Sequence, residues 1–144
     1  MKALTIALLL AAAPFAAHAA DDFTFVTTGK VVDGIRVPAE GAAFQGVQVT
    51  TYTAQVTYLN GKKETAEGKC GAWRNPPGAQ FPTTGICVVP HVYEQQYSCQ
   101  PEGTAASNCW GYLRGLPDGP WAGRTGLITY HSDAKGLSGV GRWN

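Results

Sequence analysis

From residue 21 onward, the chain alternates apolar and polar residues in short runs that turn-forming residues separate. Phe23 and Phe25, for example, alternate with Thr24 in a run that we expect to end near Gly29. A period of two is the pattern of a half-buried strand, and no stretch of ten or more residues holds the spacing of an amphipathic helix. We predict eight strands, near residues 23–29, 47–59, 62–73, 84–89, 92–99, 109–115, 125–131 and 137–143.

The predicted strand 47–59 is the longest, and its apolar phase changes along its length. Val47 and Val49 are apolar, and from Tyr52 onward the even-numbered positions are apolar instead. This change predicts a β-bulge near residues 50 and 51. The two faces after that point are Tyr52, Ala54, Val56 and Tyr58 on one side and Thr51, Thr53, Gln55 and Thr57 on the other. Either face is compatible with lining an interior, as a packed core or as a polar cavity respectively.

Two connections between the predicted strands matter for the fold. Asn60-Gly61 predicts a type I′ hairpin turn, because both central residues of that turn need a positive φ. The segment 32–46 is predicted as the longest stretch without secondary structure. No repeat, linker or low-complexity tract divides the chain, so we expect a single folded domain.

The composition supports an all-β fold. The chain has 18 glycines, all after residue 20, and only 15% charged residues, a composition that suits a turn-rich β protein. Eight antiparallel strands can close into a barrel or form a two-sheet sandwich. Closure removes exposed sheet edges, and Gly139 and Gly141 suit a barrel corner or an aromatic ring packed over bare backbone. We therefore predict a single antiparallel eight-stranded β-barrel, with a two-sheet β-sandwich as the alternative.

Residues 1–20 have the three-part organisation of a secretory signal peptide. Lys2 is followed by an apolar run over residues 3–13 and by small residues around Ala17 and Ala19. We expect this leader to be removed, which leaves residues 21–144 as the barrel domain in the periplasm or outside the cell. The apolar run is too short to cross about 30 Å of hydrocarbon, and no second run follows, so no membrane span is expected.

Charge argues against polyanionic partners. Without Lys2, 10 basic and 10 acidic side chains remain, so the formal net charge of the predicted domain is zero. Neither nucleic acid nor an anionic membrane surface is expected as a partner, because binding to either needs a basic surface. No pattern in the sequence specifies an oligomeric state.

Four cysteines follow the leader, an even number that predicts disulfides in an oxidising compartment. Three pairings are possible, and we favour Cys70 with Cys87 and Cys99 with Cys109. Each of these pairs closes a hairpin that the flanking residues already predict, and opposite residues in an antiparallel ladder have the close Cα spacing that a disulfide needs. No pair is spaced C-x-x-C and no histidine stands in a ligand pattern with them, so neither a metal nor a haem is expected.

The register that Cys99 and Cys109 impose brings aromatic and polar side chains onto one face of a hairpin. Trp110, Tyr112 and Arg114 then stand opposite Ser98, Gln96 and Glu94. Indole and phenol faces can cover a flat ligand or a sugar ring, while an arginine held by a glutamate would orient a polar substituent. The same arrangement is also an ordinary cross-strand ladder. The residues predicted to bind a ligand are Trp110, Tyr112, Arg114, Glu94 and Gln96.

No catalytic residue is assigned. His131, Ser132 and Asp133 have the composition of a catalytic triad, but neighbours along a strand point to opposite faces and cannot relay a proton together. Phosphate-binding and nucleophile-elbow motifs are absent, and the other carboxylates are scattered in turns or beside lysines. No cofactor is therefore expected.

Residues 119–126, with the sequence GPWAGRTG, and residues 139–143, with the sequence GVGRW, resemble the glycine-punctuated segment of allene oxide cyclase and dirigent-type barrels. The resemblance covers about the last 26 residues and the number of strands. It implies an eight-stranded barrel with a lumen that holds an apolar or aromatic molecule. The catalytic carboxylates and ligand residues of those families match no position here, and the four cysteines depart from their pattern, so fold transfers better than activity.

These patterns support three functional hypotheses. The first is a non-enzymatic barrel that binds a small, partly apolar molecule. The second is an isomerase or cyclase of the allene oxide cyclase or dirigent kind, which predicts an ionisable residue with a perturbed pKa in the lumen. The third is an envelope interaction or inhibitor module that inserts the loop 74–83 into a partner, which predicts a filled barrel and a protruding loop.

Overall fold

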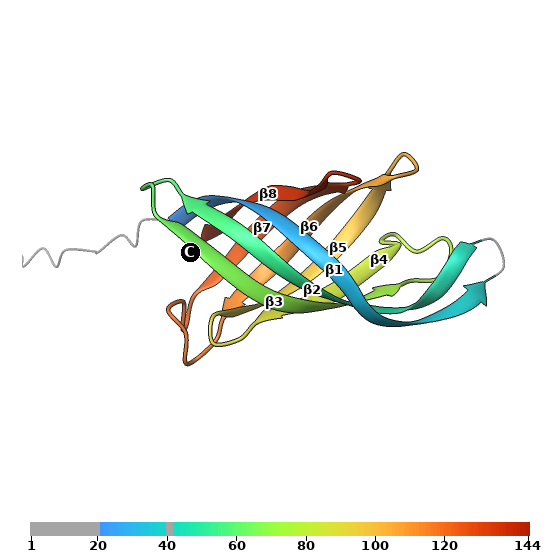
Figure 1. The fold of residues 1–144 in the computed structure, drawn as a ribbon, viewed down its shortest axis with the longest axis horizontal. Helices are drawn as coiled ribbons and strands as arrows, with labels where there is room; N and C mark the ends of the chain where they lie inside the picture. The colour runs from blue at the N-terminus through green and yellow to red at the C-terminus, as the bar shows by residue number, and fades with distance from the viewer. Residues whose placement is uncertain (1–20, 40–41) are drawn as a thin grey trace, which may run out of the picture.

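The computed structural model describes residues 21–39 and 42–144, and the predicted leader lies outside the described residues. Every regular element of the described chain is a β-strand (Figure 1). The strands are β1 (Asp21–Ala39), β2 (Ala42–Tyr58), β3 (Lys63–Arg74), β4 (Thr83–Val89), β5 (Tyr93–Glu102), β6 (Ala106–Gly115), β7 (Thr125–Asp133) and β8 (Gly136–Trp143). In this part of the chain there is no helix of the length and hydropathy needed to cross a membrane.

The described strands form one closed sheet. Each strand pairs antiparallel with the next, and β8 pairs back with β1. The closing register is continuous from Asp21 opposite Trp143 to Thr27 opposite Leu137. The predicted antiparallel eight-stranded barrel is therefore confirmed, and the sheet does not split into the alternative sandwich.

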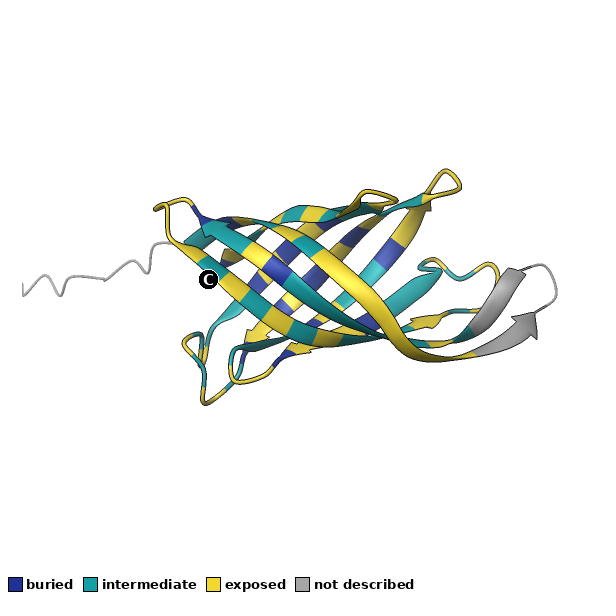
Figure 2. Cartoon of the chain, viewed as in Figure 1, coloured by how far each residue is buried: buried dark blue, intermediate teal, exposed yellow. Residues whose placement is uncertain are grey.

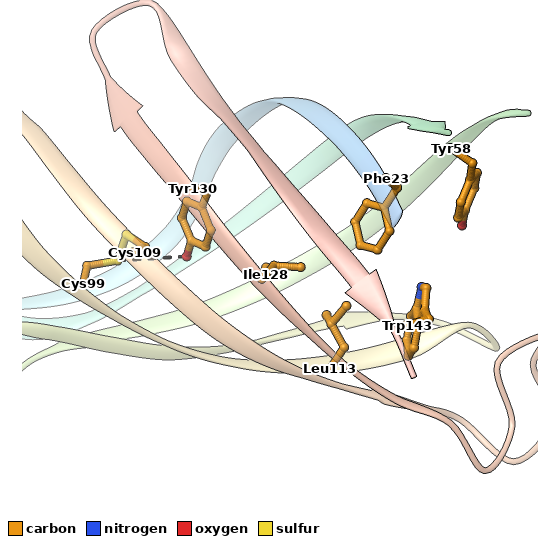
Figure 3. Close-up of a cluster of buried hydrophobic side chains, with 8 residues drawn as sticks. All are labelled: Phe23, Tyr58, Cys99, Cys109, Leu113, Ile128, Tyr130 and Trp143. Atoms are coloured by element: carbon orange, nitrogen blue, oxygen red, sulfur yellow. Dashed lines mark hydrogen bonds between the residues drawn. A yellow bond between two sulfur atoms is a disulfide. The ribbon is translucent and has the colours of Figure 1, made fainter. Parts of the chain in front are cut away.

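Side chains alternate between the interior and the outer wall along the strands. Figure 2 shows this as alternating buried and exposed residues, most regularly along β4, β6 and β7. β2 turns Ala54 and Tyr58 into the barrel, where both are buried, and leaves Gln55 exposed on the outer wall. The apolar face of the predicted strand 47–59 therefore lines the interior. The core cluster in Figure 3 contains Phe23, Tyr58, Cys99, Cys109, Leu113, Ile128, Tyr130 and Trp143.

Glycines on the inner face of β8 make room for aromatic side chains of β1. A Cβ atom on Gly139 would stand 2.9 Å from Cζ of Phe25, and one on Gly141 would collide with the ring of Phe23. The rings therefore occupy the space that side chains on β8 would fill. This is one of the two roles that the sequence predicted for these glycines, an aromatic packed over bare backbone.

The prediction for residues 32–46 was wrong. β1 continues to Ala39 and β2 begins at Ala42, so most of this segment is an antiparallel ladder rather than a loop. The two strands extend beyond the rest of the barrel at the right of Figure 1. The segment lacks the strict alternation of a half-buried strand because the described side chains of Val31, Val32 and Ile35 are all exposed.

The predicted bulge is present at the expected level of the sheet, but on the neighbouring strand. Val31 pairs with Thr50 and Asp33 pairs with Val49, so the extra residue is Val32 of β1. The ladder between β2 and β3 runs without a shift through the same level. Gln48 and Thr50 line the interior and Val47 is exposed, so the phase change in the sequence arises because apolar residues occupy the outer face at Val47 and Val49, not because β2 is irregular.

The hairpin at Asn60-Gly61 forms where it was predicted, but with a different turn. The backbone N–H of Gly61 donates to the carbonyl of Tyr58 at 2.9 Å, and Gly61 has φ +84°. Asn60 keeps a negative φ, since His91 is the described non-glycine residue with a positive φ. A type I turn followed by a left-handed glycine therefore replaces the type I′ turn, as in three-residue hairpin loops.

Both predicted disulfides are present. Cys70 bonds to Cys87 across β3 and β4, and Cys99 bonds to Cys109 across β5 and β6. The Cα atoms are 4.0 Å and 4.1 Å apart, as expected for directly opposite residues in an antiparallel ladder. Restricting the unfolded chain in this way contributes about 3 kcal/mol per bridge.

Candidate functional site: the lumen of the barrel

One end of the lumen is closed by an aromatic stack. Trp121, in the connection between β6 and β7, stacks on Trp143 with ring centroids 4.9 Å apart and planes only 4° from parallel. It also stacks on Tyr58, with centroids 5.9 Å apart. Its backbone lies against Gly115, where any Cβ atom would collide with the Trp121 carbonyl. The connection therefore folds back over the barrel end and places an indole in the opening.

Arg124 holds this stack in place. Its Nη1 lies 2.8 Å from a carboxylate oxygen of Asp21, and its Nε and Nη2 donate to the carbonyls of Asn144 and Trp143. The guanidinium also lies 4.9 Å from the centroid of the Trp121 ring. Arg124 therefore connects the start of β1, the end of β8 and the closing indole through charge-assisted and cation–π contacts.

Next to this aromatic stack, the lumen contains a cavity of about 370 Å³. Its lining runs from Trp121 and Trp143 at the closed end to Val31, Asp133 and Gly136 at the opposite end, where all three are exposed. The cavity is therefore a pocket that opens at one end of the barrel. Side chains in the middle of its wall are Phe25, Tyr52, Ala54, Val56, Ala66, Gln95, Tyr97, Ile128 and Tyr130.

Tyrosine hydroxyl groups supply most of the polarity inside this pocket. The hydroxyls of Tyr52 on β2 and Tyr93 on β5 lie 3.4 Å apart, so two strands that are not neighbours meet across the lumen. The buried side chain of Gln95 lines the same pocket as Tyr130. The Tyr97 hydroxyl lies against the backbone of Gly85.

These phenols are all neutral at physiological pH. Desolvation by burial is the main cause that raises the pKa of Tyr52, Tyr93, Tyr97 and Tyr130 above the usual value of 10.0. Burial also raises the pKa of Tyr58, whose hydroxyl donates to a Glu64 carboxylate oxygen at 3.0 Å. The lumen therefore presents hydroxyl groups as hydrogen-bond donors, not as phenolate bases.

The ionisable groups at the pocket wall besides the tyrosines are two carboxylates. Glu64 lies at the closed end, where it accepts from Tyr58 and pairs with Lys62 at 2.5 Å. Asp133 lies at the open end. No Lys, Arg or His belongs to the lining formed by the described residues. The pocket therefore contains no cationic group that would pair with an anion.

The predicted ligand-binding residues lie together, but on the outer wall. Trp110, Tyr112 and Arg114 share the outer face of β6, in register with Ser98, Gln96 and Glu94 of β5 as predicted. Arg114 and Glu94 form an ion pair of 2.8 Å. None of the five predicted residues lines the pocket that the described residues enclose. Their role in binding stays a prediction about a second, external surface.

Residues of the loop between β3 and β4 also contact this external surface. The ring of Phe81 packs edge-on against Trp110, with centroids 5.0 Å apart. The Asn75 side chain donates to the Phe81 carbonyl at 2.6 Å, and the Asn75 backbone donates to Pro82. The loop is therefore fastened across its base and folded along the outer wall.

The histidine at the end of β7 is separated from its neighbouring serine as expected. Ser132 lines the pocket, whereas His131 hydrogen-bonds Asn108 at 3.1 Å and pairs with Glu102 at 3.3 Å. In the range that the structure describes, no three His, Cys, Asp or Glu side chains are grouped so that they could hold a metal ion.

Tyr52 and Tyr58 stand on the apolar face predicted for residues 47–59, whereas no pattern in the sequence had pointed to Tyr93, Tyr97 and Tyr130. Tyr93 and Tyr97 occur at alternate positions with Gln95, on the face of β5 opposite to Glu94 and Gln96. For Tyr97, the strand pairing contains an indication of its position, because Tyr97 lies opposite Gly85 on β4 and Gly111 on β6. A tyrosine flanked by glycines on both sides indicates a ring that lies along a wall.

Comparisons of the chain with protein-family models, with characterised proteins and with solved structures found no match. The resemblance of residues 119–126 and 139–143 to allene oxide cyclase and dirigent-type barrels therefore stays a prediction.

Proposed function

We propose that this protein binds a small, partly apolar molecule inside its barrel, without chemical conversion. The observation that carries the proposal is the pocket of about 370 Å³, closed at one end by Trp121 and walled by inward-facing aromatic and aliphatic side chains. Ligand pockets typically measure about 300–1,000 Å³ and combine an apolar lining with a few convergent polar groups. The pocket described above has that size and composition.

The two other hypotheses fit the interior less well. An interaction module would have a filled barrel and a protruding loop, whereas here the lumen is hollow and Phe81 packs along the wall. An isomerase or cyclase would use an acid or base that exchanges protons near neutral pH. The lumen does contain ionisable residues with perturbed pKa values, as this hypothesis predicts. The pKa values of these tyrosines are shifted upward, however, away from the neutral range, and the Glu64 carboxylate accepts from Tyr58.

We further infer that the protein works in an oxidising compartment, the periplasm or the extracellular space. The support for this is the pair of disulfides formed by all four cysteines of the chain. Structural disulfides persist where thiols are not kept reduced. A pocket in this compartment would encounter molecules that cross or leave the cell envelope.

The proposal is tested by titration with a neutral, apolar fluorophore, N-phenyl-1-naphthylamine, whose emission rises in apolar surroundings. We expect saturable binding of one molecule per chain. Ala66 lines the pocket, and its replacement Ala66→Phe would place a ring in the lumen. This variant should weaken binding by at least about tenfold, which is about 1.4 kcal/mol.

The matched control is Thr65→Phe, which adds the same ring to the exposed neighbouring position on β3. It should bind the fluorophore like the unmodified protein. If Ala66→Phe does not fold, Thr50→Trp at the open end and Thr51→Trp on the outer wall give the same comparison. Absence of saturable binding, or equal binding by the lumenal and outer variants, would contradict the proposal.

A further inference from the structure

The hydroxyl groups of Tyr52 and Tyr93 have one more proton than their mutual hydrogen bond uses. Tyr52 and Tyr93 carry two O–H protons, and a single hydrogen bond of 3.4 Å joins their oxygens. One proton therefore lies between the two oxygens, and the other is left to donate elsewhere. Because both side chains line the pocket, the cavity is where a ligand can accept it.

The hydroxyl proton of Tyr130 also makes only a weak hydrogen bond. The contact partner of its hydroxyl is a sulfur atom and not an oxygen. Its neighbour is Sγ of Cys99 at 4.0 Å, and Figure 3 shows this contact as a dashed line. Cys99 is part of a disulfide and has no proton, so Tyr130 is the donor, and a divalent sulfur is a weak acceptor. An oxygen atom of a ligand would be a better one.

Charge in the pocket is arranged against both kinds of ion. The two carboxylates at the ends of the lining repel an anion, and no cationic side chain among the described lining residues would compensate it. A cation gains little from either carboxylate in return for leaving water for an apolar space. Glu64 already has Lys62 and Tyr58 as partners, and Asp133 is exposed at the open end, where it accepts from the backbone of Lys135. Burial raises the pKa of every lumenal tyrosine discussed above, which is independent support for an interior that penalises charge.

From this geometry we propose that the ligand is an uncharged molecule with an apolar body and a carbonyl-type acceptor oxygen, which binds the free hydroxyl proton of the Tyr52 and Tyr93 pair. This inference rests on the proposed function, since it assigns the ligand class of the same pocket. It makes Tyr52 and Tyr93 the residues that select a ligand by its acceptor, while the apolar wall contributes affinity without that selectivity.

The test uses four naphthalenes of similar size that displace N-phenyl-1-naphthylamine. 2-Acetylnaphthalene is neutral and has an acceptor, 2-isopropylnaphthalene is neutral and has none, 2-naphthoate is an anion, and trimethyl(2-naphthyl)ammonium is a cation. We expect 2-acetylnaphthalene to bind about fivefold tighter than 2-isopropylnaphthalene, as one net hydrogen bond provides. Both ions should bind at least about tenfold more weakly than the ketone.

The double variant Tyr52→Phe and Tyr93→Phe removes both hydroxyls and keeps both rings, whereas each single variant leaves one hydroxyl whose proton can still reach the ligand. In the double variant, the advantage of the ketone over the hydrocarbon should shrink toward equality, while binding of the hydrocarbon stays within about twofold. Thr53→Val, which removes a hydroxyl from the neighbouring position outside the pocket lining, is the control that should not remove this advantage. If the double variant fails to fold, the infrared C=O stretch of 2-acetylnaphthalene bound to the unmodified protein carries the test, because a hydrogen bond from a hydroxyl lowers its frequency and an unshifted stretch would contradict the inference.

The outcomes separate the two proposals. If none of the naphthalenes binds, or if Ala66→Phe binds them all as well as the unmodified chain does, the proposed function fails and this inference fails with it. If they bind and Ala66→Phe abolishes that binding, the pocket is the site. In that case, an ion binding as tightly as the ketone, or a ketone advantage that survives the double Tyr→Phe variant, overturns the inference alone.

Discussion

The hydroxyl group of Tyr97 lies against the backbone of Gly85, its register partner on β4, so that a Cβ atom at position 85 would stand 2.5 Å from the phenol oxygen. The same Cβ would stand 2.6 Å from the carbonyl oxygen of Gly71. The ring can lie along the barrel wall because residue 85 has no side chain. The volume that Tyr97 leaves free by lying flat is part of the cavity that the proposed function needs.

Replacing Gly85 with alanine should therefore destabilise the barrel. The added methyl group must push the Tyr97 ring toward the lumen or move the β3 backbone, and overpacking of this kind costs about 1–3 kcal/mol. Urea unfolding followed by tryptophan fluorescence measures the loss. Gly71→Ala is the matched control, because a Cβ on Gly71 meets nothing within 4 Å. Equal stability of the two variants would show that the ring does not need the bare backbone.

Arg124 should be the residue on which closure of the barrel end depends. Its side chain is largely buried and connects Asp21, the Trp121 ring and the carbonyls at the chain end. Arg124→Met keeps the length of the side chain and removes these contacts, which leaves Asp21 without its cation. We expect a loss of about 1–3 kcal/mol in the free energy of unfolding, with a red shift of the tryptophan emission as water reaches the stack.

The control for this variant is Arg142→Met. Arg142 pairs with Asp22 in the same part of the barrel, but on the exposed outer wall. Exposed ion pairs contribute little to stability, so this variant should unfold close to the unmodified protein and keep its emission maximum. If Arg142→Met is as damaging as Arg124→Met, the effect is one of surface charge and not of the closing stack.

The strands could be predicted because water contacts only one face of most of them. Burial alternates along β6, with Leu113 inside and Tyr112 and Arg114 outside, because the strand forms a wall between the lumen and the solvent. The disulfides follow from the same register, since opposite cysteines in a ladder have the right spacing. Where both faces are exposed, as at Val31 and Val32, alternation has no physical cause, and the continuation of β1 was missed.

The pocket was harder to predict than the barrel. Whether a lumen is filled or hollow depends on how far rings such as Tyr97 and Phe25 lie along the wall, which is decided by glycines on other strands. The contact between Tyr52 and Tyr93 joins residues that are 41 positions apart in the sequence, and it depends on the tilt of the strands in the closed barrel. The sequence pattern instead indicated Trp110 and Tyr112, because a row of aromatic residues along one strand can be recognised without knowing how the barrel closes.

The external row of Trp110, Tyr112 and Arg114 has its own test. Trp110 and Tyr112 are 39% and 50% exposed, so the part of the Trp110 ring that Phe81 does not contact and the Tyr112 ring can cover a flat molecule or a sugar ring. If the sequence prediction holds, the double variant Trp110→Ala and Tyr112→Ala should lose binding of such a ligand, measured by calorimetry with soluble oligosaccharides and planar aromatics. Ala66→Phe should leave that binding unchanged. A ligand whose affinity follows Ala66→Phe and ignores the double variant would remove the external row as its site.

Alkaline pH should unfold the barrel through its lumenal tyrosines. Burial holds the folded-state pKa of Tyr52, Tyr97 and Tyr130 above 10.0, the value that we take for the unfolded chain. Their contribution to stability is therefore fully present below about pH 10 and is lost as the pH rises above that value toward the folded-state pKa. Each tyrosine should lower the free energy of unfolding by up to about 1.4 kcal/mol per pH unit in that range, because the unfolded chain releases a proton that the folded chain retains.

Urea unfolding between pH 8 and 11.5 measures this slope, and absorbance at 295 nm reports phenolate formation in the same samples. Phenolate from the lumenal groups should appear together with the loss of native near-ultraviolet circular dichroism, not before it. Tyr97→Phe removes one titrating group and should make the fall in stability shallower, whereas Phe25→Leu, which alters the same wall without removing a proton, should not. Ionisation of every tyrosine while the native spectrum persists would mean that water reaches these phenols freely, which is incompatible with the closed, low-polarity interior on which the proposed binding site depends.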